Sequence, residues 1–345
     1  MRKPAMTSKE RVTAAFQGKP FDIIPLVNPT SIANVDSMNL AKQYFPFVHH
    51  DPYKMAALAC VGHETLRFDT VAPYFSVCGE AAALGANVDW GSVDVVPNVR
   101  SGVLKNASEF KQPANYLDKK YIKVVTGAIK LLKGKFGDSV AIVGKVVGPV
   151  SLAFFLHGIQ NTHSGIVLHR DDIKQFVDKL GALAIEFAVA QIDAGADIIT
   201  VSDDASSNHI SRDAFRYFAM DANKRLCDSI KPGAFTVFHC SGKILDIADL
   251  VIDAGFDALS FDSRNDVKEL KGKVSDNIKL IGCINNPMIL LNGSKEDIRN
   301  EVFNCINNHI DMVSPECAIP CRVTNQNLMA LHDSIQLYYK RSQKP

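Results

Sequence analysis

Short apolar runs alternate with longer segments of helical periodicity along most of the chain, and the first helix is predicted near its start. Thr7 and Glu10 stand three residues apart, which is the spacing of a capping box, and Val12 and Phe16 begin an apolar stripe. We therefore predict an N-terminal helix over about residues 7–17. The alternation of strand-like and helical segments that follows is typical of parallel βαβ units.

The pattern is clearest where a long amphipathic helix leads directly into a strand. Apolar residues repeat at helical spacing over about 171–194, Gly195 is placed to end the helix, and a β-rich run occupies 197–202. The junction itself recurs, because IDAGAD at 192–197 is echoed by IDAGFD at 252–257. Two equivalent helix-to-strand turns predict a repeating unit that reverses direction on one face of a barrel.

Eight segments read as buried strands, and eight parallel strands are the number that closes a (β/α)8 barrel. We therefore predict an α/β fold of the (β/α)8 TIM-barrel class, formed as a single domain over residues 1–345. The interval from about 75 to 137 is longer than one helix requires, so we expect an extra hairpin or excursion there. The candidate strands lie near residues 22–28, 66–73, 140–147, 197–202, 235–239, 257–262, 278–284 and 311–316.

The composition fits a protein with a large core and indicates no nucleic-acid or membrane partner. Of the 345 residues, 47% are hydrophobic and 22% are charged, and the formal net charge is +1. No stretch approaches the roughly 20 apolar residues that span a bilayer, and the start of the chain lacks the apolar core of a signal peptide. We therefore expect a cytoplasmic protein. The eight cysteines lack the dense spacing of a disulfide scaffold, so most are expected to be reduced core residues.

Polar residues stand at the carboxyl ends of the predicted strands, which is where α/β barrels build their active sites. Any one of them alone is equally well explained as an ordinary loop residue. Because several strand ends converge on one mouth, we expect these side chains to share a pocket. The residues in question are Asn28, Asp203, Asp204, His239, Cys240, Asp262, Asn285, Asn286, Glu316 and Cys317.

His239 and Cys317 together suggest a metal site. Imidazole nitrogen and thiolate sulfur suit Zn²⁺, and a catalytic zinc keeps one position open for substrate. No CxxC pair or HExxH helix accompanies them in the sequence, so their spacing alone does not define a site. A separate basic segment, 119–135, surrounds apolar positions and predicts an amphipathic helix whose charged face is either solvated or docks an acidic partner.

Longer stretches of the chain resemble the uroporphyrinogen decarboxylase superfamily, and more closely its methylcobamide:coenzyme M methyltransferase branch. The likeness spans nearly the whole chain, beginning with SKERVTAAFQGKPFDIIP at 8–25. The other segments that carry it are GANVDWG at 85–91, VVGPVSLA at 146–153, DIITVSDDASSNHIS at 197–211, FHCSG at 238–242, GCINNPMILLNGSKEDIRNEV at 282–302 and VSPECAIPCRVTNQNLMAL at 313–331.

The resemblance also separates this chain from true uroporphyrinogen decarboxylases. Those enzymes carry an arginine-rich segment after the first strand, which holds the many carboxylates of the substrate. Here the region reads PLVNPTSIANVDSMN at 25–39 and contains no arginine. Because a polycarboxylate needs cationic forks, the decarboxylase interpretation loses its main physical support. A glutamate that the family has near residue 82 is replaced by Ala82, which indicates a divergent member.

Members of the methyltransferase branch bind zinc through a His-x-Cys-Gly motif after strand five and a distal cysteine after strand eight. His239 falls on the histidine of this pattern, and Cys317 falls on the distal cysteine. The middle ligand departs from it, because Ser241 stands where the cysteine is expected and Cys240 stands one place earlier.

The altered motif leaves three outcomes open for zinc. Cys240 supplies the thiolate through a local backbone shift, although adjacent side chains at a strand end point to opposite faces. Alternatively, a water, Asp203, His209 or Cys321 completes the site. In the third outcome zinc is absent or weakly held.

The resemblance implies a corrinoid-dependent methyltransferase that moves a methyl group from a methylated corrinoid protein to a small thiol acceptor such as coenzyme M. Zinc, held by His239 and Cys317, would bind the thiol and lower its pKa so that a thiolate forms at neutral pH. Asp203 would orient the imidazole or the substrate, or would simply cap a turn. Asn285 would help to line the pocket, or would be a turn residue.

Other functions fit the same sequence. A substrate:corrinoid methyltransferase would run in the opposite direction, demethylating a small methyl donor to load the carrier, and a decarboxylase would need no metal. From a different class, a catalytically inactive barrel could serve as a binding subunit for a corrinoid protein, which the altered zinc motif favours.

Overall fold

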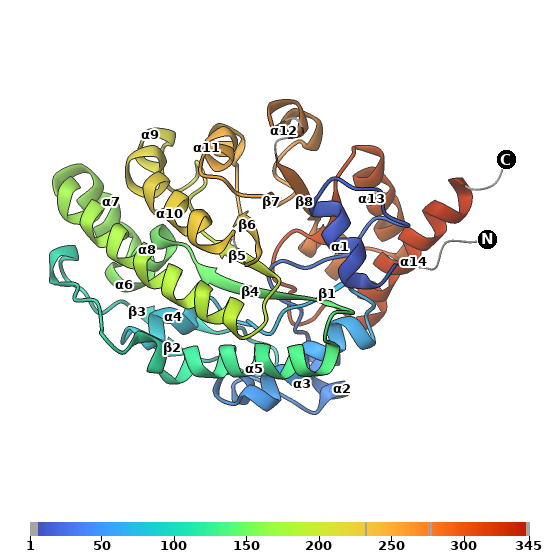
Figure 1. The fold of residues 1–345 in the computed structure, drawn as a ribbon, viewed down its shortest axis with the longest axis horizontal. Coiled ribbons are helices and arrows are strands. Elements are labelled where there is room, and N and C mark those ends of the chain that lie inside the picture. The colour runs from blue at the N-terminus through green and yellow to red at the C-terminus, as the bar shows by residue number, and fades with distance from the viewer. Residues whose placement is uncertain (1–5, 232, 275, 277, 343–345) are drawn as a thin grey trace.

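Seven parallel strands form a curled sheet at the centre of the molecule, and helices surround it (Figure 1). The computed structural model describes residues 6–231, 233–274, 276 and 278–342. The ends of the predicted 1–345 span, residues 1–5 and 343–345, lie outside the described residues. In sheet order, the strands are β1 (Thr70–Val71), β4 (Ala141–Val147), β5 (Ile198–Ser202), β6 (Phe235–Cys240), β7 (Ala258–Phe261), β8 (Lys279–Ile284) and β9 (Met312–Pro315).

The predicted first strand, 22–28, is present as a single bridge that closes the ring between β9 and β1. Leu26 pairs in parallel with Val313, whose N–H donates to Pro25 O at 3.0 Å. On the other side, Asp69 N donates to Leu26 O at 2.7 Å, and the Asp69 carboxylate accepts from Leu26 N at 2.9 Å. Because Pro25 has no N–H, a regular ladder cannot run through it, and a side chain replaces part of the missing pairing.

The prediction of an α/β barrel is therefore confirmed. The other seven strands coincide with predicted ones, although β1 keeps two residues of the predicted 66–73. Each strand pairs in parallel with its neighbour along the whole row from β1 to β9. Parallel pairing brings all the carboxyl ends of the strands to one rim, which is the mouth of the barrel.

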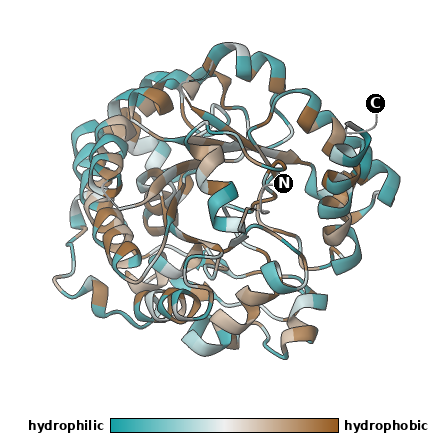
Figure 2. Ribbon diagram, turned by 45° about the vertical axis from the view of Figure 1, so that its right-hand side comes forward, coloured by the Kyte–Doolittle hydropathy of each residue, from teal (hydrophilic) through white to brown (hydrophobic). Residues whose placement is uncertain are grey.

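The helix α1 (Ser8–Phe16) fills the opposite end of the barrel, and Figure 2 shows the N-terminal segment lying across the middle of the ring. Thr7 caps the helix through a capping box with Glu10. Phe16 stacks on Phe235 with ring centroids 4.5 Å apart. The inward side chains of the lower strand layer, among them Val143, complete this apolar plug. The mouth is thus the end of the barrel that remains for chemistry.

The outer helices bury their apolar faces on the sheet. In Figure 2 the central strands are largely brown, while teal gathers on the outward surfaces of the helices. The helices outside the interval between β1 and β4 are α2 (Val35–Ala41), α3 (Pro52–Glu64), α6 (Pro149–His157), α7 (Ile159–Leu168), α8 (Arg170–Asp193), α9 (Arg212–Ala214), α10 (Met220–Ile230), α11 (Ala248–Asp253), α12 (Val267–Val274), α13 (Lys295–Asn307) and α14 (Asn325–Ser342). Short 3₁₀ or π segments span Phe47–His50, Ala107–Glu109, Tyr116–Asp118, Phe215–Ala219, Leu245–Ile247 and Asn286–Leu291.

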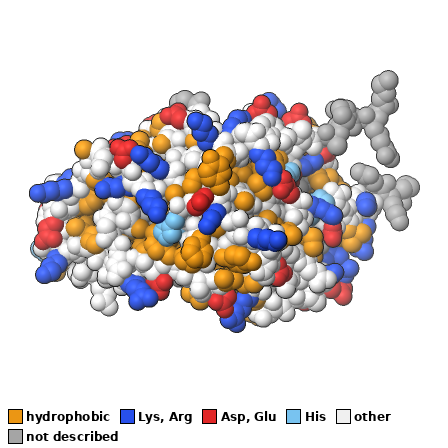
Figure 3. All heavy atoms as spheres, turned by 90° about the horizontal axis from the view of Figure 1, so that it is seen from below, with side chains coloured by type: hydrophobic (Ala, Val, Ile, Leu, Met, Phe, Trp, Pro, Cys, Tyr) orange, Lys and Arg blue, Asp and Glu red, His pale blue; other side chains and the backbone are white. Residues whose placement is uncertain are grey.

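The long interval between β1 and β4 holds more than one helix. It contains α4 (Cys78–Ala83), an antiparallel pair of strands, β2 (Asn87–Asp89) and β3 (Asn98–Ser101), and the amphipathic α5 (Lys120–Phe136). Figure 3, seen from the side of α3 and α5, shows basic, acidic and apolar side chains interspersed on this face. Among the described residues, no helix combines the length and the apolar character needed to cross a bilayer.

Candidate active site at the barrel mouth

A cavity of about 200 Å³ lies at the carboxyl ends of the strands. A wider hollow of about 480 Å³ adjoins it and shares Ser151, Phe155 and Asp204 with it. The strand ends and the first turns after them therefore form a two-part recess. The inner cavity is lined by Val77, Val147, Ser151, Phe155, Ser202, Asp203, Asp204, His239, Ser241 and Cys317.

His239 and Cys317, which are 78 positions apart in sequence, meet in this cavity. Both side chains line its wall, and Ser241 Oγ, from the same strand end as His239, donates to Cys317 Sγ at 3.7 Å. Burial alone would raise the pKa of the Cys317 thiol, but the His239 charge and the hydrogen bonds from His239 and Ser241 lower it to about 7. On its other side, His239 Nδ1 bonds with Ser260 Oγ at 3.0 Å, which fixes the ring. The pair is therefore an oriented thiol and imidazole.

Cys240 does not take part in this arrangement. Successive side chains of a strand point to opposite faces, so Val237, His239 and Ser241 face the barrel interior. Cys240 belongs instead to the large apolar cluster between sheet and helices, and burial raises the pKa of its thiol well above the ordinary value. Cys321 lies in the same apolar cluster. The structure thus brings neither cysteine to the cavity.

Asp203 lines the cavity and also caps a helix. Its carboxylate accepts from Ser151 N at 2.7 Å and from Val150 N at 3.4 Å, at the first turn of α6. Gly148 makes this contact possible, because a Cβ there would lie 2.2 Å from Asp203 Cγ. Burial raises the pKa of Asp203 to about 7, against the lowering effect of the hydrogen bonds from Ser151 and Val150. The capping interpretation of Asp203 therefore holds, at the wall of the cavity.

Asn285 caps the turn after β8 and does not line the inner cavity. Its Oδ1 accepts from Met288 N at 2.7 Å, which caps the turn after β8, and its Nδ2 donates to Ser263 Oγ at 2.7 Å. The prediction that Asn285 lines the inner pocket is not met, because a loop amide at this position serves its own turn. Glu316 likewise ties neighbouring loops together, by accepting from Ser263 N and Asn286 N.

Of the three histidine and cysteine ligands that the motif resemblance implies, two lie at the mouth. His239 and Cys317 are joined by the Ser241 hydroxyl, which stands at the place of the expected third ligand. Asp203 caps α6, and His209 is paired with an aspartate at 3.1 Å. In the part of the chain that the structure describes, no three His, Cys, Asp or Glu side chains are grouped so as to hold a metal ion. Since catalytic zinc takes three protein ligands, these residues do not fit the expected zinc site.

The sequence analysis did not single out Glu80, a buried carboxylate near the mouth. It noted only that Ala82 replaces a glutamate of the family. Glu80, two positions earlier on α4, is fully buried and accepts from Val147 N at 2.6 Å, Tyr74 Oη at 2.9 Å and Tyr116 Oη at 3.1 Å. Burial raises its pKa to about 7, although the three hydrogen bonds oppose the shift. The carboxylate ties α4 to the strand whose last residue lines the cavity.

Lys145 was also missed. It lies on the interior face of β4, where its Nζ donates to Thr30 O at 3.2 Å and sits 4.6 Å from the centre of the Tyr74 ring. Burial lowers the pKa of this lysine to about 8, while the Cys317 and Glu80 charges raise it. A lysine in the otherwise apolar run AIVGKVV is the signal that could have found it.

Comparisons with known proteins extend this description. The family model described as "Uroporphyrinogen decarboxylase (URO-D)" matches residues 7–338. The methylcobamide:CoM methyltransferase MtaA of Methanosarcina barkeri is 32% identical over 338 residues, covering 96% of this chain and 98% of that protein. The methylcobamide:CoM methyltransferase MtbA of Methanosarcina acetivorans is 28% identical with the same coverage. A solved methyltransferase from Methanosarcina mazei superposes with a TM-score of 0.92 at 29% identity, covering 97% of this chain and 99% of that one.

Proposed function

Since the chain belongs to the uroporphyrinogen decarboxylase (URO-D) family, we propose that it is the methyltransferase kind of member. It passes a methyl group from a methylated corrinoid, carried by a partner protein, to a small thiol such as coenzyme M. Relatives that match almost its whole length are named methylcobamide:CoM methyltransferases. The single observation that carries the proposal is the Cys317–His239 pair in the mouth cavity.

The cavity wall argues against a decarboxylase that acts on a polycarboxylate. Among the described residues, the inner cavity is lined by Asp203 and Asp204 and by no arginine or lysine, and Arg100, which lines the adjoining hollow, is paired with Asp89 at 2.7 Å. A substrate with many carboxylates would meet like charge there, without the bidentate cations that such groups require. A small thiol such as coenzyme M carries one acidic group instead of many, so it meets far less of this repulsion, and a volume of about 200 Å³ suits a molecule of that size.

The transfer needs a thiolate. An ordinary thiol with a pKa of about 8.5 is ionised to only a few per cent at pH 7, so a proton acceptor must stand beside the acceptor sulfur. His239, oriented by Ser260, takes that proton as a neutral imidazole, and the adjacent Cys317 sulfur stabilises the imidazolium that forms. The acceptor sulfur then bonds to the methyl carbon while the cobalt–carbon bond breaks. The electron pair of the broken cobalt–carbon bond stays on cobalt, so the donor leaves as cob(I)amide.

The size of the recess decides where the corrinoid stays. Neither the inner cavity nor the adjoining hollow of about 480 Å³ can enclose a whole corrinoid ring with its carrier. We therefore infer that the carrier protein holds the corrinoid ring over the mouth, and that the small thiol binds in the inner cavity below it. Asp203 contributes by holding the first turn of α6, and with it Ser151, at the wall of the cavity.

Zinc has no assigned step in this proposal, because the two donors and the Ser241 hydroxyl do not supply a third ligand. The zinc-assisted form of the reaction, which the motif resemblance implies, would need a third donor that none of the neighbouring described side chains offers. Activation of the thiol is assigned to the imidazole instead.

The proposal is tested by mixing the purified chain with methylcobalamin and a thiol. We expect cob(I)alamin and methylated thiol to form in equal amounts, with coenzyme M and with mercaptoethanol, which lacks the sulfonate, tested side by side. The reverse assay supplies cob(I)alamin and a methylated thiol. Faster reaction in that direction would assign the chain to demethylation, and no transfer in either direction would overturn a catalytic role.

A further inference from the structure

A second cavity, of about 790 Å³, lies between the β2–β3 hairpin, α4 and the start of α5. It shares no lining residue with the mouth cavity or with the hollow beside it. Its volume falls within the roughly 300–1,000 Å³ that is usual for small-molecule sites. The proposed methyl transfer makes no use of this space.

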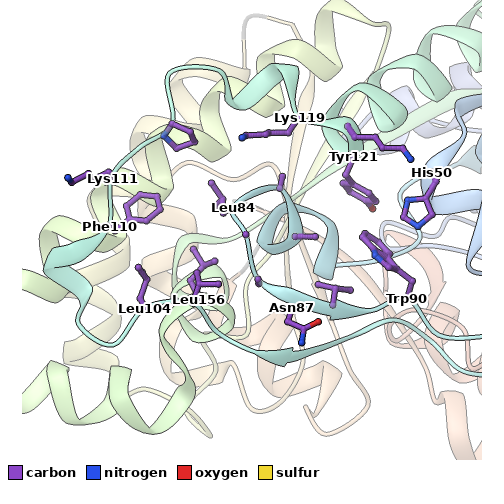
Figure 4. Close-up of a pocket in the computed structure, with 18 residues that line it drawn as sticks. His50, Leu84, Asn87, Trp90, Leu104, Phe110, Lys111, Lys119, Tyr121 and Leu156 are labelled. Atoms are coloured by element: carbon purple, nitrogen blue, oxygen red, sulfur yellow. The ribbon is translucent and has the colours of Figure 1, made fainter.

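Aromatic side chains line both ends of this second cavity. Figure 4 shows Phe110 at one end, with Trp90 and His50 at the other. Trp90 packs between Tyr121, with ring centroids 5.6 Å apart, and two histidines, His49 at 5.3 Å and His50 at 4.8 Å. Trp90 is half-buried, so part of the indole faces the cavity. The exposed part of the indole, among the apolar side chains that line the cavity, favours a ligand with an apolar body that packs beside it.

The charged groups of the second cavity are all basic. Lys111, Lys119 and Lys120 line it, and none of the other described residues of the lining carries a carboxylate. None of the three forms an ion pair within the described residues, whereas Lys123, one turn further along α5, is paired with Asp118 at 2.8 Å. In Figure 4 Lys119 extends over the middle of the cavity. Three unneutralised cations beside an apolar wall create a positive potential that attracts an anion.

We propose that the second cavity binds a small organic anion with an apolar body. Its acidic group lies between Lys119 and Lys120, and its body packs against Trp90. Neither feature is sufficient alone, since an exposed lysine pair holds an ion weakly and an apolar hollow selects no charge. The combination selects for ligands that carry both parts.

The test uses Trp90, the single tryptophan of the chain, as a reporter inside the cavity. The probe is anilinonaphthalene sulfonate, and the matched probe is N-phenylnaphthylamine, which has the same ring system without the acid group. Binding is followed by quenching of Trp90 emission, with calorimetry for the stoichiometry. We expect saturable binding of one sulfonate probe, and binding of the neutral probe weaker by about tenfold.

Charge-reversal variants show whether the sulfonate probe binds in the second cavity or elsewhere on the surface. Lys119→Glu combined with Lys120→Glu should weaken the sulfonate probe by about tenfold or more, while Lys130→Glu, an exposed position on the same helix, should change it by less than about twofold. His239→Ala should leave this binding unchanged, since the mouth lies elsewhere. Equal affinity for the two probes, or no effect of reversing both lysines, would overturn the proposal, as would the absence of saturable quenching.

Discussion

Replacing Glu80 by glutamine should stabilise the folded chain at about pH 8 and change little at about pH 5. The carboxyl group is fully buried, and burial raises its pKa from 4.5 to about 7. In the unfolded chain the group ionises near its ordinary pKa, so between these two values the folded state holds a proton that the unfolded state has lost. Stability due to Glu80 therefore falls as the pH rises through this window.

The size of the effect follows from the pKa and the contacts. A rise from 4.5 to about 7 corresponds to about 3 kcal/mol of stability lost by the wild type above the window. Glutamine retains the geometry, because its oxygen can accept from Val147 N and Tyr74 Oη, and its amide can donate to Tyr116 Oη, which turns its own proton away. The variant should thus gain up to about 3 kcal/mol over the wild type at about pH 8.

Urea unfolding of both proteins at the two pH values measures the difference directly. Glu80→Ala is the control: it leaves three buried donors without an acceptor and should cost about 3 kcal/mol or more at about pH 5, and about 2–3 kcal/mol less than that at about pH 8, because it removes the same titrating group. A stability difference between the glutamine variant and the wild type that does not change with pH would refute the reasoning, because the carboxyl would then not titrate inside the fold.

Other substitutions test the mouth and the core. Ser241→Cys should raise bound zinc, measured by metal analysis, from below about a tenth of an equivalent to about one, while Ser241→Ala stays low. His49 is buried with neither ring nitrogen bonded among the described groups, so His49→Phe should raise the free energy of unfolding by about 1 kcal/mol in urea. Gly148→Ala should cost about 1–3 kcal/mol in the same assay, since its Cβ would overlap Asp203. At Gly134 an added Cβ would meet no described atom from another part of the chain within 4 Å, so Gly134→Ala should instead stabilise α5 by about 1 kcal/mol.

The barrel could be predicted from local signals, because each βα unit repeats the same junction and buries the same kind of strand. IDAGAD and IDAGFD mark two such junctions, and both precede strands of the sheet. The position of polar residues at strand ends also follows from parallel pairing, so the meeting of His239 and Cys317 was predictable as a hypothesis.

The rest of the site depends on contacts between distant segments, which a single segment does not reveal. Glu80 is buried because Tyr74 and Tyr116 supply its hydrogen bonds. Lys145 is buried because a carbonyl from another loop and a tyrosine ring receive its charge. Cys240 points away from the cavity because successive side chains of a strand alternate between the two faces of the sheet. The alternation can be predicted from the sequence, but a comparison of motifs alone does not include it.

The rate of methylcobalamin demethylation by two cysteine variants shows whether the thiol at the barrel mouth takes part in methyl transfer. Cys317→Ala removes the thiol inside the cavity, and Cys240→Ala removes one on the opposite face of the barrel wall. We expect the first variant to lose about 10²-fold or more in rate and the second to stay within about twofold of the wild type, both with an unchanged circular dichroism spectrum. Full activity of Cys317→Ala, or an equal loss in both variants, would contradict this expectation.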